Sequence, residues 1–477
     1  MRRREFLGIV AAGSCLPERW LGWAASAESP TRTVGPGYAS PSEAMKAERE
    51  KLLYVSALYV GTKADRPDYL AVIDADPASP SHTKVVHRTP MPQVGDELHH
   101  FGWNVCSRCH GNADRMRRFL TVPGVRSSRI HILDAADPRA PKLHKVIEAD
   151  EVKKANLSAP HTVHCLGTGE VMISMLGDRE GNGPGGFLLL DDKFDIKGRW
   201  ERSVAGMHYN YDFWYRPRHN VMVSSEWGAP NTYGKGFDPK DVEAGNYGRH
   251  IHFWDWKRRE IVQSVDLGET GLIPLEVRFH HNPASTHGFV GAALSSTMWH
   301  FHKPGESWTA EKVIEVSPVE REGWPFPVPG LITDLVVSMD DRFLYFSNWL
   351  HGDIRQYDLR DPSKPKLTGQ VWLGGVIGKA EPVGGRTLPG GPQMLQLSLD
   401  GERLYVTSSL LSSWDNQFYP DMAERGSYLL QIDCNTDSGG MKPNENFLVD
   451  FGAEPAGPAH AHEIRYPGGD CTSDIFV

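Results

Sequence analysis

A strand–turn–strand unit recurs along the chain, and this repeat limits the available folds more than any other feature. The clearest copy, residues 335–359, reads as an apolar strand, an Asp-Asp turn, an aromatic strand, a polar loop and a strand ending in Tyr-Asp-Leu. A second copy starts at Leu395 and closes with a strand at residues 427–433. Two such strands around an Asp-Gly or Asp-Asp turn are typical of a β-hairpin. Recurrence at intervals of about 50–70 residues is typical of propeller blades joined by long loops.

Weaker copies complete the repeat. They begin at His99, His161, Tyr211, Leu275 and Ala461. With the two clear units they make seven inner hairpins, and early strands at 52–60 and 69–74 are expected to close the last blade. We therefore predict an all-β fold, with one seven-bladed β-propeller domain over residues 51–477. An array of β-sandwiches or two unrelated β domains is the alternative, and no G-x-G-x-x-G or phosphate-loop motif is present.

The N-terminus reads as an export signal. Arg2, Arg3 and Arg4 precede Phe6-Leu7, a short apolar stretch follows, and Ala25-Ser26-Ala27 has the A-x-A cleavage pattern. Residues 1–27 are thus predicted to be a twin-arginine (Tat) signal peptide, which delivers a periplasmic protein with no membrane attachment after cleavage. Residues 28–50 are predicted to form a linker and a short helix that starts at Pro41 and runs to about Lys51.

Charge excludes one class of partner. The formal net charge is −9, and no basic stretch lies beyond the extreme N-terminus. Binding to nucleic-acid phosphates needs clustered Lys and Arg, so no nucleic acid is expected as a partner.

Several histidines occur at positions that the repeat places at one end of the central channel. In a propeller, the start of each innermost strand lies at one end of the central channel. The loop between the second and third strands of each blade returns to the same end. The predicted metal ligands at these positions are His99, His100, His161, His164, His351 and His462. Asp212, Glu276, Asp334 and Gln393 occupy comparable starts. A single His is usually a hydrogen-bonded structural residue, but several imidazoles together suit copper, iron or zinc, and copper is favoured by the affinity order.

Cysteines beside the first His pair admit three interpretations. Cys106 and Cys109 form a C-x-x-C pair followed by His110. Cys106 is either a reactive thiol beside the metal, or half of a structural disulfide or zinc site, or part of a c-type haem attachment sequence. Export of folded protein by the Tat route argues against the haem interpretation. Cys165 is predicted to be a small buried apolar residue.

Long ordered strings reveal a resemblance. The sequences HHFGWNVCSRC, HTVHCLGTGEVMIS, RFLYFSNWLHGDIRQYDL and HEIRYPGGDC are similar to those of the selenium-binding protein and methanethiol oxidase family, from about Pro67 to the C-terminus. The resemblance implies a seven-bladed propeller, copper as cofactor, and His99, His100, His161, His164, His351 and His462 as the family's histidines. It also implies that Cys106 binds selenium and supports activity. Phe101, where a small residue is common, and His110 depart from the family pattern.

Two functions follow from this resemblance. The first is a copper-dependent methanethiol oxidase that converts methanethiol, O₂ and water to formaldehyde, hydrogen sulfide and hydrogen peroxide, with Cys106 as the catalytic thiol. Its partners are then a small thiol substrate and O₂. The alternative is a non-catalytic propeller that binds selenium, copper or a thiol, because storage needs the same soft ligands.

Overall fold

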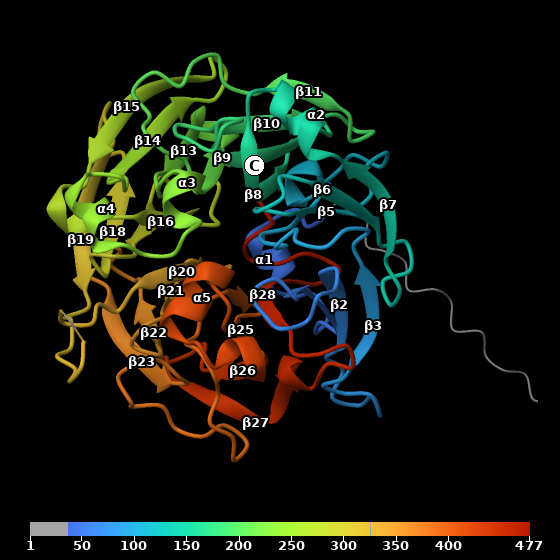
Figure 1. The fold of residues 1–477 in the computed structure, drawn as a ribbon. Coiled ribbons are helices and arrows are strands. Elements are labelled where there is room, and N and C mark those ends of the chain that lie inside the picture. Colours follow the sequence, from blue (N-terminus) through green and yellow to red (C-terminus); the bar gives the residue numbers. More distant parts are fainter. Residues whose placement is uncertain (1–36, 325) are drawn as a thin grey trace, which may run out of the picture. The chain divides into compact units, whose positions relative to one another are not determined.

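A closed ring of seven four-stranded antiparallel sheets forms the described part of the chain (Figure 1). The computed structural model divides into two units, residues 1–32 and 33–477, and describes residues 37–324 and 326–477. The predicted signal peptide, residues 1–27, lies outside the described residues. The predicted all-β, seven-bladed propeller is confirmed.

Six blades consist of four consecutive strands each, and the seventh combines both ends of the chain. Blades 1 and 2 contain β4 (Gly102–Trp103), β5 (Phe119–Pro123), β6 (Ile130–Asp134), β7 (Lys142–Ile147), β8 (Ser158–Cys165), β9 (Val171–Gly177), β10 (Gly186–Leu190) and β11 (Ile196–Arg199). Blades 3 and 4 contain β12 (Phe213–Arg216), β13 (Val221–Ser225), β14 (His250–Asp255), β15 (Glu260–Asp266), β16 (Pro274–Phe279), β17 (Gly288–Ala292), β18 (Thr297–His302) and β19 (Thr309–Glu315). Blades 5 and 6 contain β20 (Ile332–Val337), β21 (Phe343–Asn348), β22 (Asp353–Asp358), β23 (Lys366–Trp372), β24 (Leu395–Leu397), β25 (Arg403–Thr407), β26 (Tyr428–Cys434) and β27 (Met441–Asp450). Blade 7 contains β28 (His460–Arg465), β1 (Leu52–Leu58), β2 (Tyr69–Asp74) and β3 (Val85–Pro90).

Burial distinguishes the inner strands from the outer ones. The first strand of each blade contacts the first strand of a neighbouring blade, as β4 does with β8 and β16 with β20. Every residue of β8 and β20 is buried, whereas the outermost strands β7 and β27 consist mostly of exposed and half-buried residues. Inner strands are packed on both faces, and outer strands face water. Residues on the inner strands therefore meet at the centre of the ring.

Closure of the ring uses the C-terminal strand. β28 pairs with β1 in antiparallel register, with Val55 opposite Ile464 and Leu58 opposite His460. The expectation that early strands close the last blade is confirmed. The innermost strand of each sheet has an unpaired edge that faces the centre of the closed ring, so these edges are protected from pairing with other chains.

Helices are short and lie in loops. The α-helices are α1 (Pro41–Ala44), α2 (Ala149–Lys154), α3 (Pro230–Tyr233), α4 (Pro239–Glu243), α5 (Ser412–Phe418) and α6 (Met422–Arg425), and single 3₁₀ turns are η1 (Ser107–Cys109), η2 (Pro217–His219), η3 (Glu269–Gly271) and η4 (Phe451–Ala453). The expected helix to Lys51 ends at Ala44 instead. Turn and bend residues follow α1, and the side chain of Glu50 is buried against Arg403, 2.6 Å from its Nε.

Candidate metal centre

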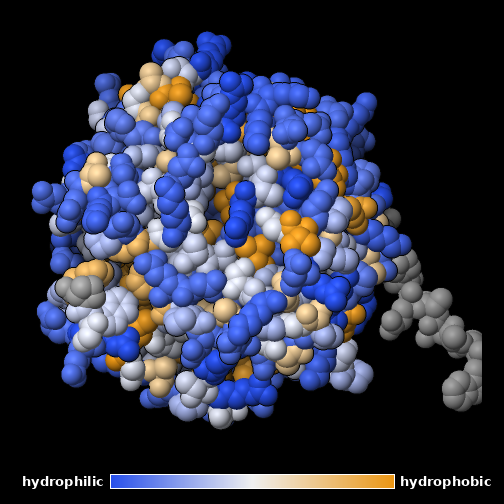
Figure 2. Space-filling view, in the orientation of Figure 1, coloured by the Kyte–Doolittle hydropathy of each residue, from blue (hydrophilic) through white to orange (hydrophobic). Residues whose placement is uncertain are grey.

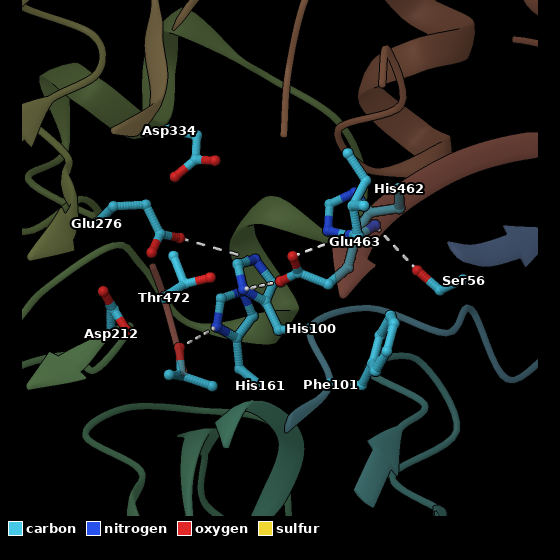
Figure 3. A network of polar contacts seen from close by, with 12 residues as sticks. Ser56, His100, Phe101, His161, Asp212, Glu276, Asp334, His462, Glu463 and Thr472 are labelled. Atoms are coloured by element: carbon cyan, nitrogen blue, oxygen red, sulfur yellow. Dashed lines mark hydrogen bonds and ion pairs between the residues drawn. The ribbon is translucent and has the colours of Figure 1, made fainter. Parts of the chain in front are cut away.

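Three imidazoles meet where the inner strands of blades 1 and 2 run side by side. His99 and His100 come just before β4, and His161 lies in β8. One ring nitrogen from each lies within 4.8 Å of those of the other two. Ring centroids are 4.1 Å apart for His100 and His161, which Figure 3 shows side by side. All three side chains are buried.

A glycine allows this close approach of the two strands. An added Cβ at Gly102 would lie 2.6 Å from the carbonyl oxygen of Val163, closer than real Cβ contacts. Gly102 thus brings the segment that carries His99 and His100 against β8.

A fourth imidazole, from β28 of blade 7, joins the three. The ring of His462 stacks on that of His99 at a centroid distance of 3.8 Å and lies 5.3 Å from that of His100. Its Nδ1–H donates to the carbonyl of Ser409 at 2.7 Å, which leaves Nε2 without a partner. A hydrogen bond of this kind fixes the tautomer and orients the ring of a metal-binding histidine. The four imidazoles of His99, His100, His161 and His462 are called the imidazole cluster below.

Unpartnered nitrogens show that the imidazole cluster suits a metal ion. The buried atoms without a hydrogen-bond partner include one from each ring: Nδ1 of His99 and Nε2 of His100, His161 and His462. Leaving so many buried polar atoms unsatisfied costs free energy, which ion coordination would recover. Burial, followed by the repulsion of neighbouring imidazoles, holds the pKa values of His99 and His100 well below the usual range. The rings are therefore neutral, which is the form that binds a late transition metal.

Carboxylates surround the imidazole cluster. The Nδ1 of His100 lies 3.1 Å from Oε2 of Glu463, and its Nε2 lies 3.7 Å from Oε1 of Glu276. Figure 3 shows Asp212, Glu276, Asp334 and Glu463 arranged around the His100 and His161 rings. Burial raises the pKa of Glu276 well above its usual range, and nearby Asp212 adds to the effect. Burial also raises the pKa of Glu463.

Two arginines hold these carboxylates in place. Arg278 Nη2 lies 2.7 Å from Glu276, and Arg465 Nη1 lies 2.7 Å from Glu463. Both pairs are spaced as Glu-x-Arg on an inner strand, so each carboxylate and its guanidinium share one face. Asp212, Glu276 and Asp334 were anticipated at their strand starts, whereas Glu463, Arg278 and Arg465 were missed. The repeated Glu-x-Arg in β16 and β28 is the sequence pattern that could have revealed them.

Two of the six predicted histidines have other surroundings. His164, also in β8, packs against the rings of Phe213 and Trp214, at centroid distances of 5.1 and 5.0 Å. A register shift between Pro160 and Val163 changes the direction of the side chains along β8. His351 lies in the turn after β21 and donates from Nε2 to the carbonyl of Val328 at 2.9 Å. The structure thus brings together His99, His100, His161 and His462, but places neither His164 nor His351 among them.

Cys106 contacts sulfur rather than imidazole. Its Sγ lies 2.7 Å from the Sγ of Cys165, and all five cysteines of the described chain are free thiols. Four residues of β8 separate Cys165 from His161, or about 13 Å at the usual rise of a strand. Cys165 is buried as expected, but its sulfur contact was missed. The contact with Cys165 places Cys106 near the end of β8, and its catalytic role stays a prediction. His110 donates from Nδ1 to the carbonyl of Gly37, 3.1 Å away, so the local contacts do not indicate a haem attachment site.

A pocket opens close to the imidazole cluster. It has a volume of about 330 Å³ and is lined in part by Glu97, Ala159 and Ser412. Glu97 and Ala159 each precede a cluster histidine by two residues. Next to it an aromatic group packs around the ring of Tyr211, which lies 4.2 Å from that of His161. Figure 2 shows a mainly hydrophilic face with apolar side chains near its centre.

Comparisons with known proteins agree with this architecture. Residues 32–477 match the 56 kDa selenium-binding protein (SBP56) family. The chain is 56% identical over 467 residues to a methanethiol oxidase of Xenopus laevis and 57% identical over 465 residues to one of Rattus norvegicus; these alignments cover 93% of this chain and 99% and 98% of the relatives. A Mus musculus relative named selenium-binding protein 2 is 56% identical, with 93% of this chain and 98% of the relative covered.

A solved structure shares the fold. The hypothetical selenium-binding protein of Sulfolobus tokodaii superposes with a TM-score of 0.88 at 44% identity, covering 93% of this chain and 99% of the other. Among the described residues, helices of the length and hydropathy needed to cross a bilayer are absent. The family match spans the whole propeller and the high identities extend over the strands that carry the imidazole cluster; the chain belongs to the 56 kDa selenium-binding protein family.

Proposed function

We propose that the protein is a copper-dependent methanethiol oxidase, which converts methanethiol, O₂ and water to formaldehyde, hydrogen sulfide and hydrogen peroxide. The observation that carries the proposal is the imidazole cluster, with four buried and unpartnered nitrogens from three blades. Relatives that are 56–57% identical are named methanethiol oxidase, which supports the same substrate here.

Copper is the metal that this donor set favours. Neutral imidazoles bind late first-row ions, and copper(II) stands highest in the affinity order. A bound copper ion would favour the thiolate form of the substrate and would accept electrons from it. His99, His100, His161 and His462 are the residues that would hold it.

Carboxylates beside the imidazole cluster suit the proton transfers. Methanethiol must lose its thiol proton, and a carboxylate whose pKa is raised by burial takes up a proton more readily than an exposed one. Glu276 Oε1 is buried without a hydrogen-bond partner, 3.7 Å from His100 Nε2, and is the atom proposed to take the proton. Glu463 orients His100 through its contact with Nδ1. Arg278 and Arg465 keep both carboxylates in position.

Cys106 is proposed to act at a distance from the imidazole cluster. Its place beside Cys165 leaves it as the candidate for selenium binding, in keeping with the family name. The second candidate function is a propeller that binds selenium, copper or a thiol without turnover, and the relative named selenium-binding protein 2 favours it. Release of sulfide and peroxide on addition of methanethiol distinguishes the two functions.

The experiment is methanethiol-dependent O₂ uptake by copper-loaded protein. We expect uptake with matching release of sulfide and peroxide, and a loss of at least about 100-fold in His161→Gln, because removing a ligand disrupts metal binding. His281→Gln is the control, since this buried histidine donates to the carbonyl of Val337 at 3.0 Å in another blade. Copper binding without any O₂ uptake would favour the storage function instead.

We also propose that residues 1–27 direct Tat export to the periplasm. Arg2-Arg3-Arg4 and Ala25-Ser26-Ala27 support this proposal. The mature periplasmic protein is expected to start at Glu28, which N-terminal mass analysis measures. Conversion of Arg3 and Arg4 to Lys should retain the protein inside the cell, and unchanged export of that variant would reject the proposal.

A further inference from the structure

Three cysteines from two blades meet beside β8. They are Cys106 and Cys109, in the loop after β4, and Cys165, the last residue of β8. We call them the thiol cluster. All three are buried, with 1%, 4% and 2% of their surfaces exposed. Cys165 donates to the sulfur of Cys106 at 2.7 Å, and the Sγ of Cys109 donates to the carbonyl of Leu166, the next residue, at 3.9 Å. The end of β8 and the residue after it therefore contact both cysteines of the loop.

The contact between Cys106 and Cys165 is close to bonding geometry. A disulfide has a sulfur–sulfur distance of about 2.05 Å, so the two atoms need to approach by only about 0.7 Å. The loop that carries Cys106 is anchored on the other side, because the backbone N–H of Ser107 donates to Asp474 at 2.7 Å. Asp474 is in turn held by Arg117, 2.6 Å away. The anchored loop and the inner strand hold the two sulfurs together.

Cations next to the thiol cluster favour a thiolate at Cys109. Arg108 has two buried nitrogens, Nε and Nη1, without hydrogen-bond partners, and its guanidinium lies 5.4 Å from the ring of Tyr215. Contact with the Cys165 side chain, followed in smaller measure by the charges of Arg115 and Arg108, lowers the pKa of Cys109 to about 7 despite its burial. Burial raises the pKa of Cys165 well above its usual range. Cys109 is thus the better nucleophile at neutral pH and the better leaving group.

We propose that the thiol cluster is a peroxide-reactive redox centre, whose oxidised form is a disulfide between Cys106 and Cys165. The Cys109 thiolate attacks hydrogen peroxide, and the O–O bond breaks to leave a sulfenic acid and hydroxide. The Cys165 sulfur displaces the sulfenic oxygen as water and forms a Cys109–Cys165 disulfide. Cys106 then attacks Cys165 and releases the Cys109 thiolate. In sum, two thiols and one peroxide give one disulfide and two waters.

Cys109 is the thiol that is released, and this determines which two cysteines form the final disulfide. Thiol–disulfide exchange releases the thiol with the lower pKa, and Cys109 is stabilised as a thiolate by its hydrogen bond and by two arginines. Cys434 and Cys471 have no part in this exchange, because their sulfurs contact the carbonyls of Ile432 and Ser398 at blade 6, away from β8. The proposal is independent of the oxidase activity, since it needs only peroxide and the three thiols.

Peptide mapping of the whole metal-free protein tests this proposal. The reduced protein is treated with one equivalent of hydrogen peroxide, free thiols are alkylated, and the digest is analysed by mass spectrometry without methanethiol. We expect a cross-linked peptide pair through Cys106 and Cys165, with Cys109, Cys434 and Cys471 alkylated. A Cys106–Cys109 disulfide as the main product, or five alkylated thiols, would overturn the proposal without any variant.

Variants test the order of the steps. Cys109→Ser should slow disulfide formation at least tenfold, because the nucleophile is lost, and Arg108→Gln should slow it to a smaller degree. Cys165→Ser should leave a sulfenic acid at Cys109 that a dimedone probe traps. Cys471→Ser, which removes a buried thiol elsewhere, should react at the unaltered rate. An unchanged rate in Cys109→Ser would show that Cys109 does not react first. These readouts do not involve O₂ uptake, so failure of the oxidase proposal would leave them unaffected.

Discussion

Glu97 shows how burial at a single residue couples stability to pH. The side chain is buried two residues before His99, where its Oε1 accepts a hydrogen bond from the backbone N–H of Ser412 at 2.6 Å. Burial raises its pKa from 4.5 to about 7, although the hydrogen bonds from Ser412 oppose the shift. Between these two pH values the folded chain therefore holds a proton that the unfolded chain has released.

The stability contributed by this proton has a definite sign. It is present below about pH 4.5 and is lost as the pH rises through about 7, by roughly 3 kcal/mol. Glu97→Gln keeps a neutral acceptor at all pH values. We expect the variant to unfold at higher urea than the parent at pH 8, but not at pH 4.5. Urea titrations at both pH values measure the difference, and a constant difference between them would contradict the assignment.

Glu463 makes a prediction of its own at the residue scale. Glu463→Gln should lower oxidase turnover by about 10–100-fold, because residues that orient a metal ligand typically carry effects of this size. Glu201→Gln is the matched control: Glu201 is equally buried and pairs with Arg199 outside the imidazole cluster. O₂ uptake measures both, and equal activity in the two variants would remove Glu463 from the proposed machinery.

At the scale of elements, the approach of the two inner strands decides whether the imidazoles can converge. Gly102→Ala would place a methyl group against the Val163 carbonyl and push the β4 segment away from β8. We expect a loss of about 1–3 kcal/mol in unfolding free energy, the usual effect of overpacking, and weaker metal binding. Gly305→Ala is the control, because no atom lies within 4 Å of its added Cβ. Denaturant melts and metal titration measure both effects. Equal unfolding free energy and equal metal affinity in the two variants would contradict the role of Gly102 in the approach of the strands.

The strands and helices also show which structural features sequence periodicity predicts and which it does not. The Asp-Asp turn between β20 and β21 could be predicted from the sequence, because Asp tolerates the left-handed φ of 59° that Asp341 adopts. The sequence did not predict the end of α1 at Ala44, and the contact of Glu50 with Arg403, 353 residues away, was also beyond local patterns. Local patterns thus predicted the strands, whereas the course of the segment before β1 involves a long-range contact.

For the whole molecule, the number of blades and the closure by both chain ends followed from the repeat. The repeat also predicted that His99, His100, His161 and His462 would meet, because propeller geometry brings strand starts together. It could not tell that Cys106 meets Cys165, since that contact depends on the register between a loop and an inner strand. Nor could it separate His351 from the imidazole cluster, because the direction of a turn residue depends on packing against Val328.

The most direct test of the metal centre is the metal content of protein purified from its native host, measured by mass spectrometry together with an EPR spectrum. The account predicts copper in the purified protein, nitrogen hyperfine structure from imidazoles, and loss of that copper in the double variant His100→Ala/His161→Ala while His281→Gln retains it. Full copper content and an unchanged spectrum in the double variant would contradict the assignment of the metal to the imidazole cluster.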